Sequence, residues 1–227
     1  DGAGTESGQS SPASATTLFA PPALPLQHTD IGNPAIAGSY QDNGASSVSV
    51  SGSGSDIWYT ADQCHYAYQT LTGDGEIIAR MTSLTKTDGW AKAGPMIRQS
   101  LTASSRHAMI QMTAGNGVQL QYRASDGAFM SSLVGSGSVP PRWLRLVRQG
   151  DQLQAYEAAD GNTWTQVGTV TIPMSNTVFV GFAVTSHNSP VLGTATFDNV
   201  LITSTSPAPT PTPTAVATNT PLPAPTN

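Results

Sequence analysis

Guanidinium, carboxamide and indole groups recur at alternating positions of several short segments. The residues concerned are Arg98, Gln121, Arg123, Trp143 and Arg145. Such groups hydrogen-bond hydroxyls and stack on the C–H faces of sugars. If their strands share one sheet, the exposed concave face is a candidate carbohydrate-binding surface. The same residues are also typical of the solvent side of an antiparallel sheet, where arginine stems cover apolar surface.

Residues suited to catalysis do not cluster in the sequence. Glycoside hydrolysis needs two carboxyl groups on either side of one bond. The chain has only three glutamates, Glu6, Glu76 and Glu157, on separate segments, and pairs of aspartates remain possible in principle although none is closely spaced. The four histidines lack metal-ligand spacing, and no nucleophile elbow or phosphate loop is present. We therefore predict a protein that is not an enzyme.

Calcium is the one cofactor for which the sequence offers weak candidates. Asp56, Asp62 and Asp74 lie in or beside Gly- and Ser-rich stretches, and loop carboxylates are common Ca²⁺ ligands. Aspartate is also a frequent turn former, and no EF-hand spacing is present. No metal ligand is assigned, and Ca²⁺ stays an open alternative.

Composition favours an extracellular β protein. Of the 227 residues 10% are charged, and the formal net charge is -5. No basic segment therefore indicates binding to nucleic acid. No run of eighteen apolar residues predicts a membrane span, and the chain begins without an initiator Met or signal peptide, as though already processed. The single cysteine, Cys64, cannot form an internal disulfide and is predicted to be a buried, inert thiol. We expect a secreted or cell-surface protein.

Short alternating segments separated by turn residues predict an all-β sandwich without helices. The expected strands are 46–52, 64–70, 75–82, 94–101, 106–113, 117–123, 142–149, 151–157, 164–172, 177–186 and 194–203. Alternation places one set of side chains in the core: Leu144, Leu146, Val178, Val180, Phe182 and Val184.

Two segments without sandwich patterning flank the predicted domain of residues 30–203. Residues 1–29 form a Ser-, Gly- and Pro-rich arm with apolar Leu18, Phe19, Leu24 and Leu26. Residues 204–227 form a Pro/Thr-rich tail of polyproline II type. The tail is either a plain spacer or a carrier of O-linked glycans.

Several motifs resemble a known family in their order along the chain. They are 89–100 (GWAKAGPMIRQS), 71–76 (LTGDGE), 141–146 (PRWLRL), 160–164 (DGNTW) and 185–188 (TSHN). Over residues 30–203 the sequence resembles bacterial secreted concanavalin A-like, or laminin-G-like, domains of unassigned function. The resemblance implies a jelly-roll sandwich of two antiparallel sheets, and it leaves the function open because this fold serves many roles.

Two functions compete at this stage. The first is a self-assembling subunit of an extracellular fibre or surface layer, in which the arm and tail contact identical neighbours. Phe19, Leu24 or Leu26 would then dock on the next subunit. The alternative is a carbohydrate-binding module or adhesin that holds a polysaccharide on the concave sheet. We expect the filament, and binding of a polysaccharide partner is the second hypothesis.

Overall fold

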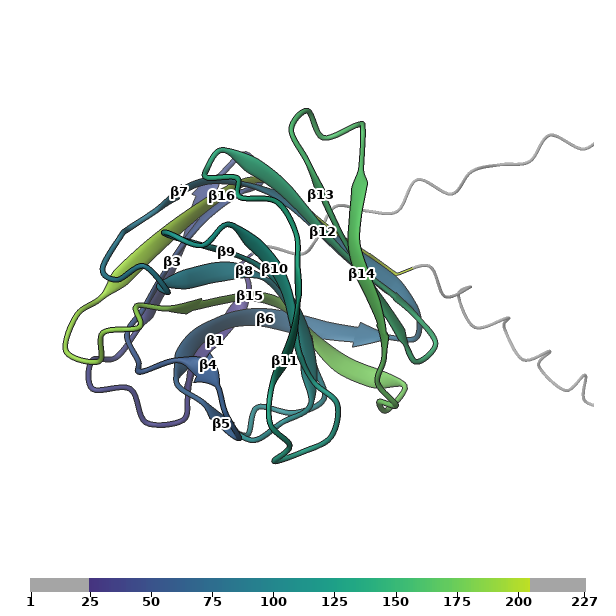
Figure 1. Cartoon of the computed structure of the whole chain (residues 1–227), viewed down its shortest axis with the longest axis horizontal. Helices are drawn as coiled ribbons and strands as arrows, with labels where there is room; N and C mark the ends of the chain where they lie inside the picture. The colour runs from purple at the N-terminus through teal and green to yellow at the C-terminus, as the bar shows by residue number, and fades with distance from the viewer. Residues whose placement is uncertain (1–24, 205–227) are drawn as a thin grey trace, which may run out of the picture.

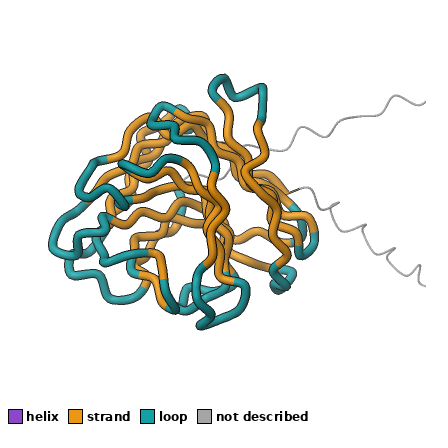
Figure 2. Tube along the Cα trace, viewed as in Figure 1, coloured by secondary structure: helices purple, strands orange, loops and turns teal. Residues whose placement is uncertain are grey.

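Two seven-stranded antiparallel sheets pack face to face in the computed structural model, which describes residues 25–204 (Figure 1). Strands and loops make up the whole of this described part, as Figure 2 shows. The predicted all-β jelly-roll sandwich is confirmed. No helix among residues 25–204 is long and apolar enough to cross a membrane.

Each sheet joins strands that are distant in sequence. Sheet A has the order β1 (Gln27–Ile31), β6 (Cys64–Thr72), β15 (Thr177–Thr185), β8 (Lys92–Arg98), β9 (His107–Thr113), β10 (Val118–Arg123) and β11 (Ser131–Val134). Sheet B has the order β14 (Thr165–Thr171), β13 (Gln152–Ala158), β12 (Arg142–Gln149), β7 (Gly75–Leu84), β16 (Gly193–Ser204), β3 (Ser47–Gly52) and β2 (Ser39–Gly44). A short hairpin of β4 (Ile57–Trp58) and β5 (Ala61–Asp62) forms a separate two-stranded sheet.

The main core lies between the two large sheets. Alternate residues of β15 and β12 point into it, including Val180, Phe182 and Leu144, as the sequence pattern predicted. The rings of Phe182 and Phe197 stack with centroids 4.3 Å apart and so join sheet A to sheet B. Burial of such side chains is the dominant favourable contribution to folding.

A second apolar cluster covers part of the outer face of sheet A. It contains Ile31, Ile57, Cys64, Tyr66, Tyr68, Met96, Met109 and Ala183. Ile57 comes from the β4–β5 hairpin, so this hairpin packs onto the sheet. Cys64 is buried, as predicted, and burial raises the pKa of its thiol to about 12.

The start of the domain differs from the prediction. Strand β1 pairs with β6 although it overlaps the predicted arm. Leu26 is 5% exposed and belongs to the main core, so the prediction that it docks on a neighbouring subunit is wrong. Leu18, Phe19 and Leu24 lie outside the described residues, as does the tail beyond Ser204.

Candidate functional site

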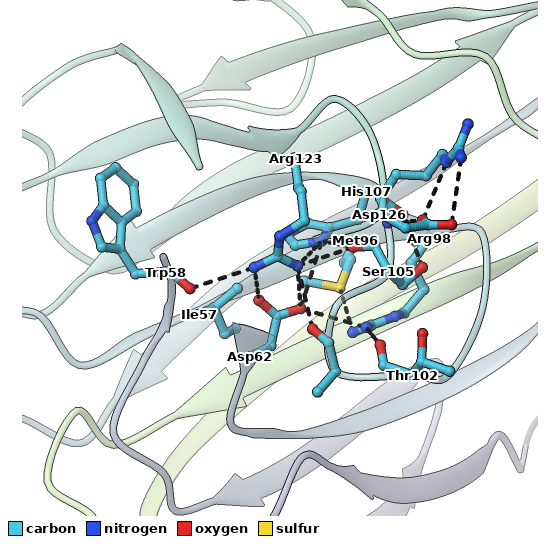
Figure 3. Close-up of polar contacts among 12 residues, drawn as sticks. Ile57, Trp58, Asp62, Met96, Arg98, Thr102, Ser105, His107, Arg123 and Asp126 are labelled. Atoms are coloured by element: carbon cyan, nitrogen blue, oxygen red, sulfur yellow. Dashed lines mark hydrogen bonds and ion pairs between the residues drawn. The ribbon is translucent and has the colours of Figure 1, made fainter. Parts of the chain in front are cut away.

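Arg98 and Arg123 converge on one buried carboxylate (Figure 3). Arg123 Nη2 lies 2.7 Å from Asp62 Oδ1, and its Nη1 lies 3.1 Å from Asp62 Oδ2. Arg98 Nη2 donates to the same Oδ2 over 3.4 Å. All three side chains are fully buried. The Asp62 carboxylate therefore compensates the charge of both guanidinium groups, and neither guanidinium is free to contact a ligand.

This ion cluster fixes the β4–β5 hairpin against sheet A. Asp62 belongs to β5, and Arg123 Nη2 also donates to the carbonyls of Trp58 and Tyr59, each over 3.4 Å. The amide of Met130 donates to the Tyr59 carbonyl over 3.1 Å. Arg123 is thus a positioning residue for the tip of this hairpin.

An open cleft of about 470 Å³ lies on the outer face of sheet A beside the hairpin tip. Its lining combines aromatic, amide and charged groups: Asp56, Trp58, Tyr59, Trp90, Lys92, Gln119, Gln121, Ser132 and His187. The hairpin and its flank supply one side, and β8, β10 and β11 supply residues from the sheet. Sites for small polar ligands commonly combine such apolar walls with a few polar groups.

Aromatic rings form the walls of the cleft. Trp90 is 42% exposed and Tyr59 is 66% exposed, which leaves ring surface open to a ligand. Lys92 Nζ lies 5.9 Å from the ring centroids of both Trp58 and Trp90, so both indoles lie near one ammonium group. Exposed aromatic rings of this kind bury large areas when a ligand covers them.

Tyr59 has an unusual backbone conformation. Its φ is 47°, in the left-handed region that bulky residues rarely adopt. His187, which also lines the cleft, has a φ of 51°. Strained residues of this kind are held in place by their surroundings and gather at functional sites. Two of them on one cleft support a binding role for it.

The charges in the cleft are paired with one another. Lys92 is 1% exposed, and its Nζ lies 2.7 Å from Asp56 Oδ1. His187 Nε2 lies 3.4 Å from Asp56 Oδ2, and its Nδ1 lies 2.9 Å from Asp88 Oδ1. One carboxylate therefore contacts both the ammonium and the imidazole.

Glutamine side chains supply the uncharged polar groups. Gln119 and Gln121 alternate on β10, and Gln121 Nε2 donates to Gln119 Oε1 over 3.1 Å. Gln111 pairs with Gln119 across β9 and β10 and is fully buried. Gln121 Oε1 and both amide atoms of Gln111 have no hydrogen-bond partner among the described residues. Leaving buried polar atoms unpaired costs about 1–3 kcal/mol each, which a ligand or water would offset.

Only one of the five predicted sugar-binding residues lines this cleft, namely Gln121. The shared-sheet hypothesis is wrong for Trp143 and Arg145, because β12 belongs to sheet B. Arg145 Nη2 lies 2.6 Å from Glu76 Oε2, and its guanidinium packs over the Trp164 ring. Sequence reasoning missed Trp58, Tyr59 and Trp90, although aromatic residues flanked by Gly, Ser and Asp were the available signal.

The three calcium candidates are far from forming one site. Asp62 is paired with two arginines, Asp56 with Lys92, and Asp74 Oδ1 accepts the amide of Gly150 over 2.7 Å. Within residues 25–204, no group of three or more His, Cys, Asp or Glu could hold a metal ion.

Solved structures share the fold at low sequence identity. A functionally unknown protein from Saccharomyces cerevisiae aligns with a TM-score of 0.59 and 18% identity, over 75% of this chain and 97% of that one. A mutant of the GH43 protein BlXynB from Bacillus licheniformis aligns with a TM-score of 0.55 and 12% identity, over 70% of this chain and 33% of that one. The carbohydrate binding module CBM66 from Bacillus subtilis aligns with a TM-score of 0.51 and 15% identity, over 78% of this chain and 95% of that one. No family model and no curated protein matches the sequence.

The class that these observations define is a jelly-roll β-sandwich of two antiparallel sheets. The chain spans about a third of the GH43 protein but nearly the whole of the carbohydrate binding module and of the yeast protein. At these identities the likeness concerns the fold alone.

Proposed function

We propose that the protein is a non-catalytic carbohydrate-binding module that holds a polysaccharide in the cleft on the outer face of sheet A. The observation that carries this proposal is the meeting of exposed aromatic rings and buried carboxamides in one open cleft. Rings bind the C–H faces of sugars while amides bind their hydroxyls. In this proposal the protein acts outside the cell, where polysaccharides are found.

Two findings favour binding over hydrolysis. The chain covers 95% of the carbohydrate binding module but only 33% of the GH43 protein. Glu157 is paired with Arg142 on sheet B, and Glu76 with Arg145, also on sheet B. Neither glutamate lies in the cleft, and they do not form the facing carboxylate pair that glycoside hydrolysis uses.

The filament hypothesis has less support than the binding hypothesis. Leu26 is committed to the core of its own domain, and the remaining arm residues lie outside the described part. The carbohydrate binding module among the similar structures supports the alternative that the sequence had placed second.

Truncation of Trp90 is the direct test. Immobilised polysaccharides would be screened with the unmodified protein, and any bound glycan would be titrated against Trp90→Ala. Loss of a central tryptophan costs roughly 2 kcal/mol in a binding site, or about thirtyfold in affinity. Trp164→Ala is the matched control because Trp164 packs against Arg145 of sheet B, away from the cleft. Equal effects of the two variants would remove the cleft from consideration.

A further inference from the structure

We propose that the cleft selects neutral glycans over acidic ones, and that glutamine carboxamides rather than cationic side chains recognise the sugar hydroxyls. This inference rests on the proposed carbohydrate-binding function. The inference names the class of glycan that the cleft binds. The fold alone does not decide this class, because lectin-like sandwiches bind many different molecules.

The cleft offers no free cation to an acidic sugar. Of the described residues that line it, Lys92 and His187 are the only basic ones. Lys92 is almost fully buried and already pairs with Asp56 over 2.7 Å. His187 lies between Asp56 and Asp88. A carboxylate or sulfate group entering here would meet Asp56, the one carboxylate among the described lining residues, and like charges repel.

The two arginines of the buried ion cluster, Arg98 and Arg123, are also already paired. Arg98 and Arg123 share Asp62 and donate in addition to backbone carbonyls, among them those of Thr102 and Ala128. Releasing either one would leave Asp62 buried with less compensation, at a cost of several kcal/mol. Recognition of acidic groups usually depends on arginine as a bidentate donor. Neither Arg98 nor Arg123 offers that donor to the cleft.

The unpaired polar atoms fit neutral hydroxyls instead. Gln121 lines the cleft, and its buried Oε1 has no hydrogen-bond partner among the described residues, while its Nε2 donates to Gln119 Oε1. Gln119 also lines the cleft, and this contact uses its acceptor oxygen but not its Nε2 donor. A free acceptor beside a free donor matches two hydroxyls of one sugar, since each hydroxyl both donates and accepts. Both glutamines are at least nine-tenths buried, so their amides are already fixed before binding.

Matched neutral and acidic polymers test the proposal. Binding of the full chain would be measured by biolayer interferometry on immobilised xylan, mannan, β-glucan and dextran, and on polygalacturonate, alginate and carboxymethyl dextran. We expect retention on at least one neutral polymer and none on its charged counterparts. Preference for an acidic polymer, lost in Trp90→Ala, would overturn this inference and leave the binding function standing. Retention on none of the polymers would overturn both.

Two variants separate charge from hydrogen bonding. Asp56→Asn keeps the oxygen that accepts the Ile57 amide over 2.7 Å but removes the negative charge that pairs with Lys92, so we expect a gain of salt-sensitive binding to the acidic polymers. Gln121→Met keeps side-chain volume without the amide, and we expect about tenfold weaker neutral binding from the lost hydrogen bonds. Gln152→Met, at an exposed position on sheet B, is the control. Unchanged neutral affinity in Gln121→Met would overturn the role of the carboxamides.

Discussion

Asp62 and Arg123 form a two-point ion pair in which both side chains are fully buried, with 2.7 Å between Oδ1 and Nη2 and 3.1 Å between Oδ2 and Nη1. Arg98 completes the cluster from strand β8, which strand β9 separates from β10. Buried pairs are strongly destabilised when one partner is removed, because the other charge remains without compensation. The pair therefore makes the position of the β4–β5 hairpin depend on one carboxylate.

We expect Asp62→Asn to lower the free energy of unfolding by about 3–5 kcal/mol, since two buried guanidinium groups would lose their counter-charge. Guanidinium chloride unfolding measures this loss directly. Asp126→Asn is the matched control, because Asp126 is 53% exposed and pairs with Arg106 at the surface. Exposed pairs contribute little to stability, so similar losses in the two variants would contradict the structural role of Asp62.

This cluster also shows where sequence reasoning stops. Alternation along β10 placed Arg123 on the same face as Gln121, and the structure confirms that placement. The pattern contains no information on what covers a face. The strands of hairpin β4–β5 span two residues each and are too short to show any periodicity. This hairpin covers Arg123, so a residue that the sequence suggested as a ligand contact is buried in the structure.

The burial of each strand explains which strands the sequence predicted and which it missed. All eleven predicted segments correspond to strands. Strands such as β3 and β12 have one buried face and hence a period of two, whereas β8 and β9 are buried at every residue. Strand β2 was missed because most of its residues are exposed, and all four residues of β11 are exposed. Trp143 and Arg145 were assigned to the wrong sheet because alternation gives the face of a strand but not its sheet.

Tyr59 provides a test that separates strain from binding. Its left-handed φ of 47° costs an ordinary L-residue about 1–2 kcal/mol, a cost that glycine avoids. We expect Tyr59→Gly to unfold at the same temperature as Tyr59→Ala or a higher one, while both variants lose affinity for the bound glycan. Thermal unfolding and glycan titration measure the two effects. A Tyr59→Gly variant that binds normally would show that this ring takes no part in recognition.

We expect the Cys64 thiol to be unreactive in the folded protein. Burial raises the pKa of its thiol to about 12, and the side chain packs in the cluster beneath the hairpin. Since the thiolate is the reactive species, we expect no reaction with a thiol reagent in buffer and reaction at one site per chain in denaturant. Rapid labelling under native conditions would mean that the hairpin opens away from sheet A.

His107 predicts how stability depends on pH. Burial lowers the pKa of its imidazole from 6.5 to about 4, and Arg98 and Arg123 act in the same direction while Asp62 opposes them. Its Nδ1 donates to the Ser105 carbonyl over 3.0 Å, and the buried Nε2 has no partner among the described residues. The ring is therefore neutral in the folded protein over a range in which the unfolded chain binds a proton.

The sign of the effect follows from this difference in proton binding. As the pH falls from 6.5 towards 4, only the unfolded state gains the proton at this position, so the free energy of unfolding decreases by up to about 1.4 kcal/mol per pH unit. Burial also lowers the pKa of His65, which adds to the same trend. The lowered pKa values of Asp126 and Asp198 act below the ordinary carboxyl value of 3.8 and so affect a more acidic range. We expect His107→Gln to flatten the slope between pH 6.5 and 4 in urea unfolding experiments, with the contribution of His65 remaining; an unchanged slope would mean that the imidazole is protonated in the folded state.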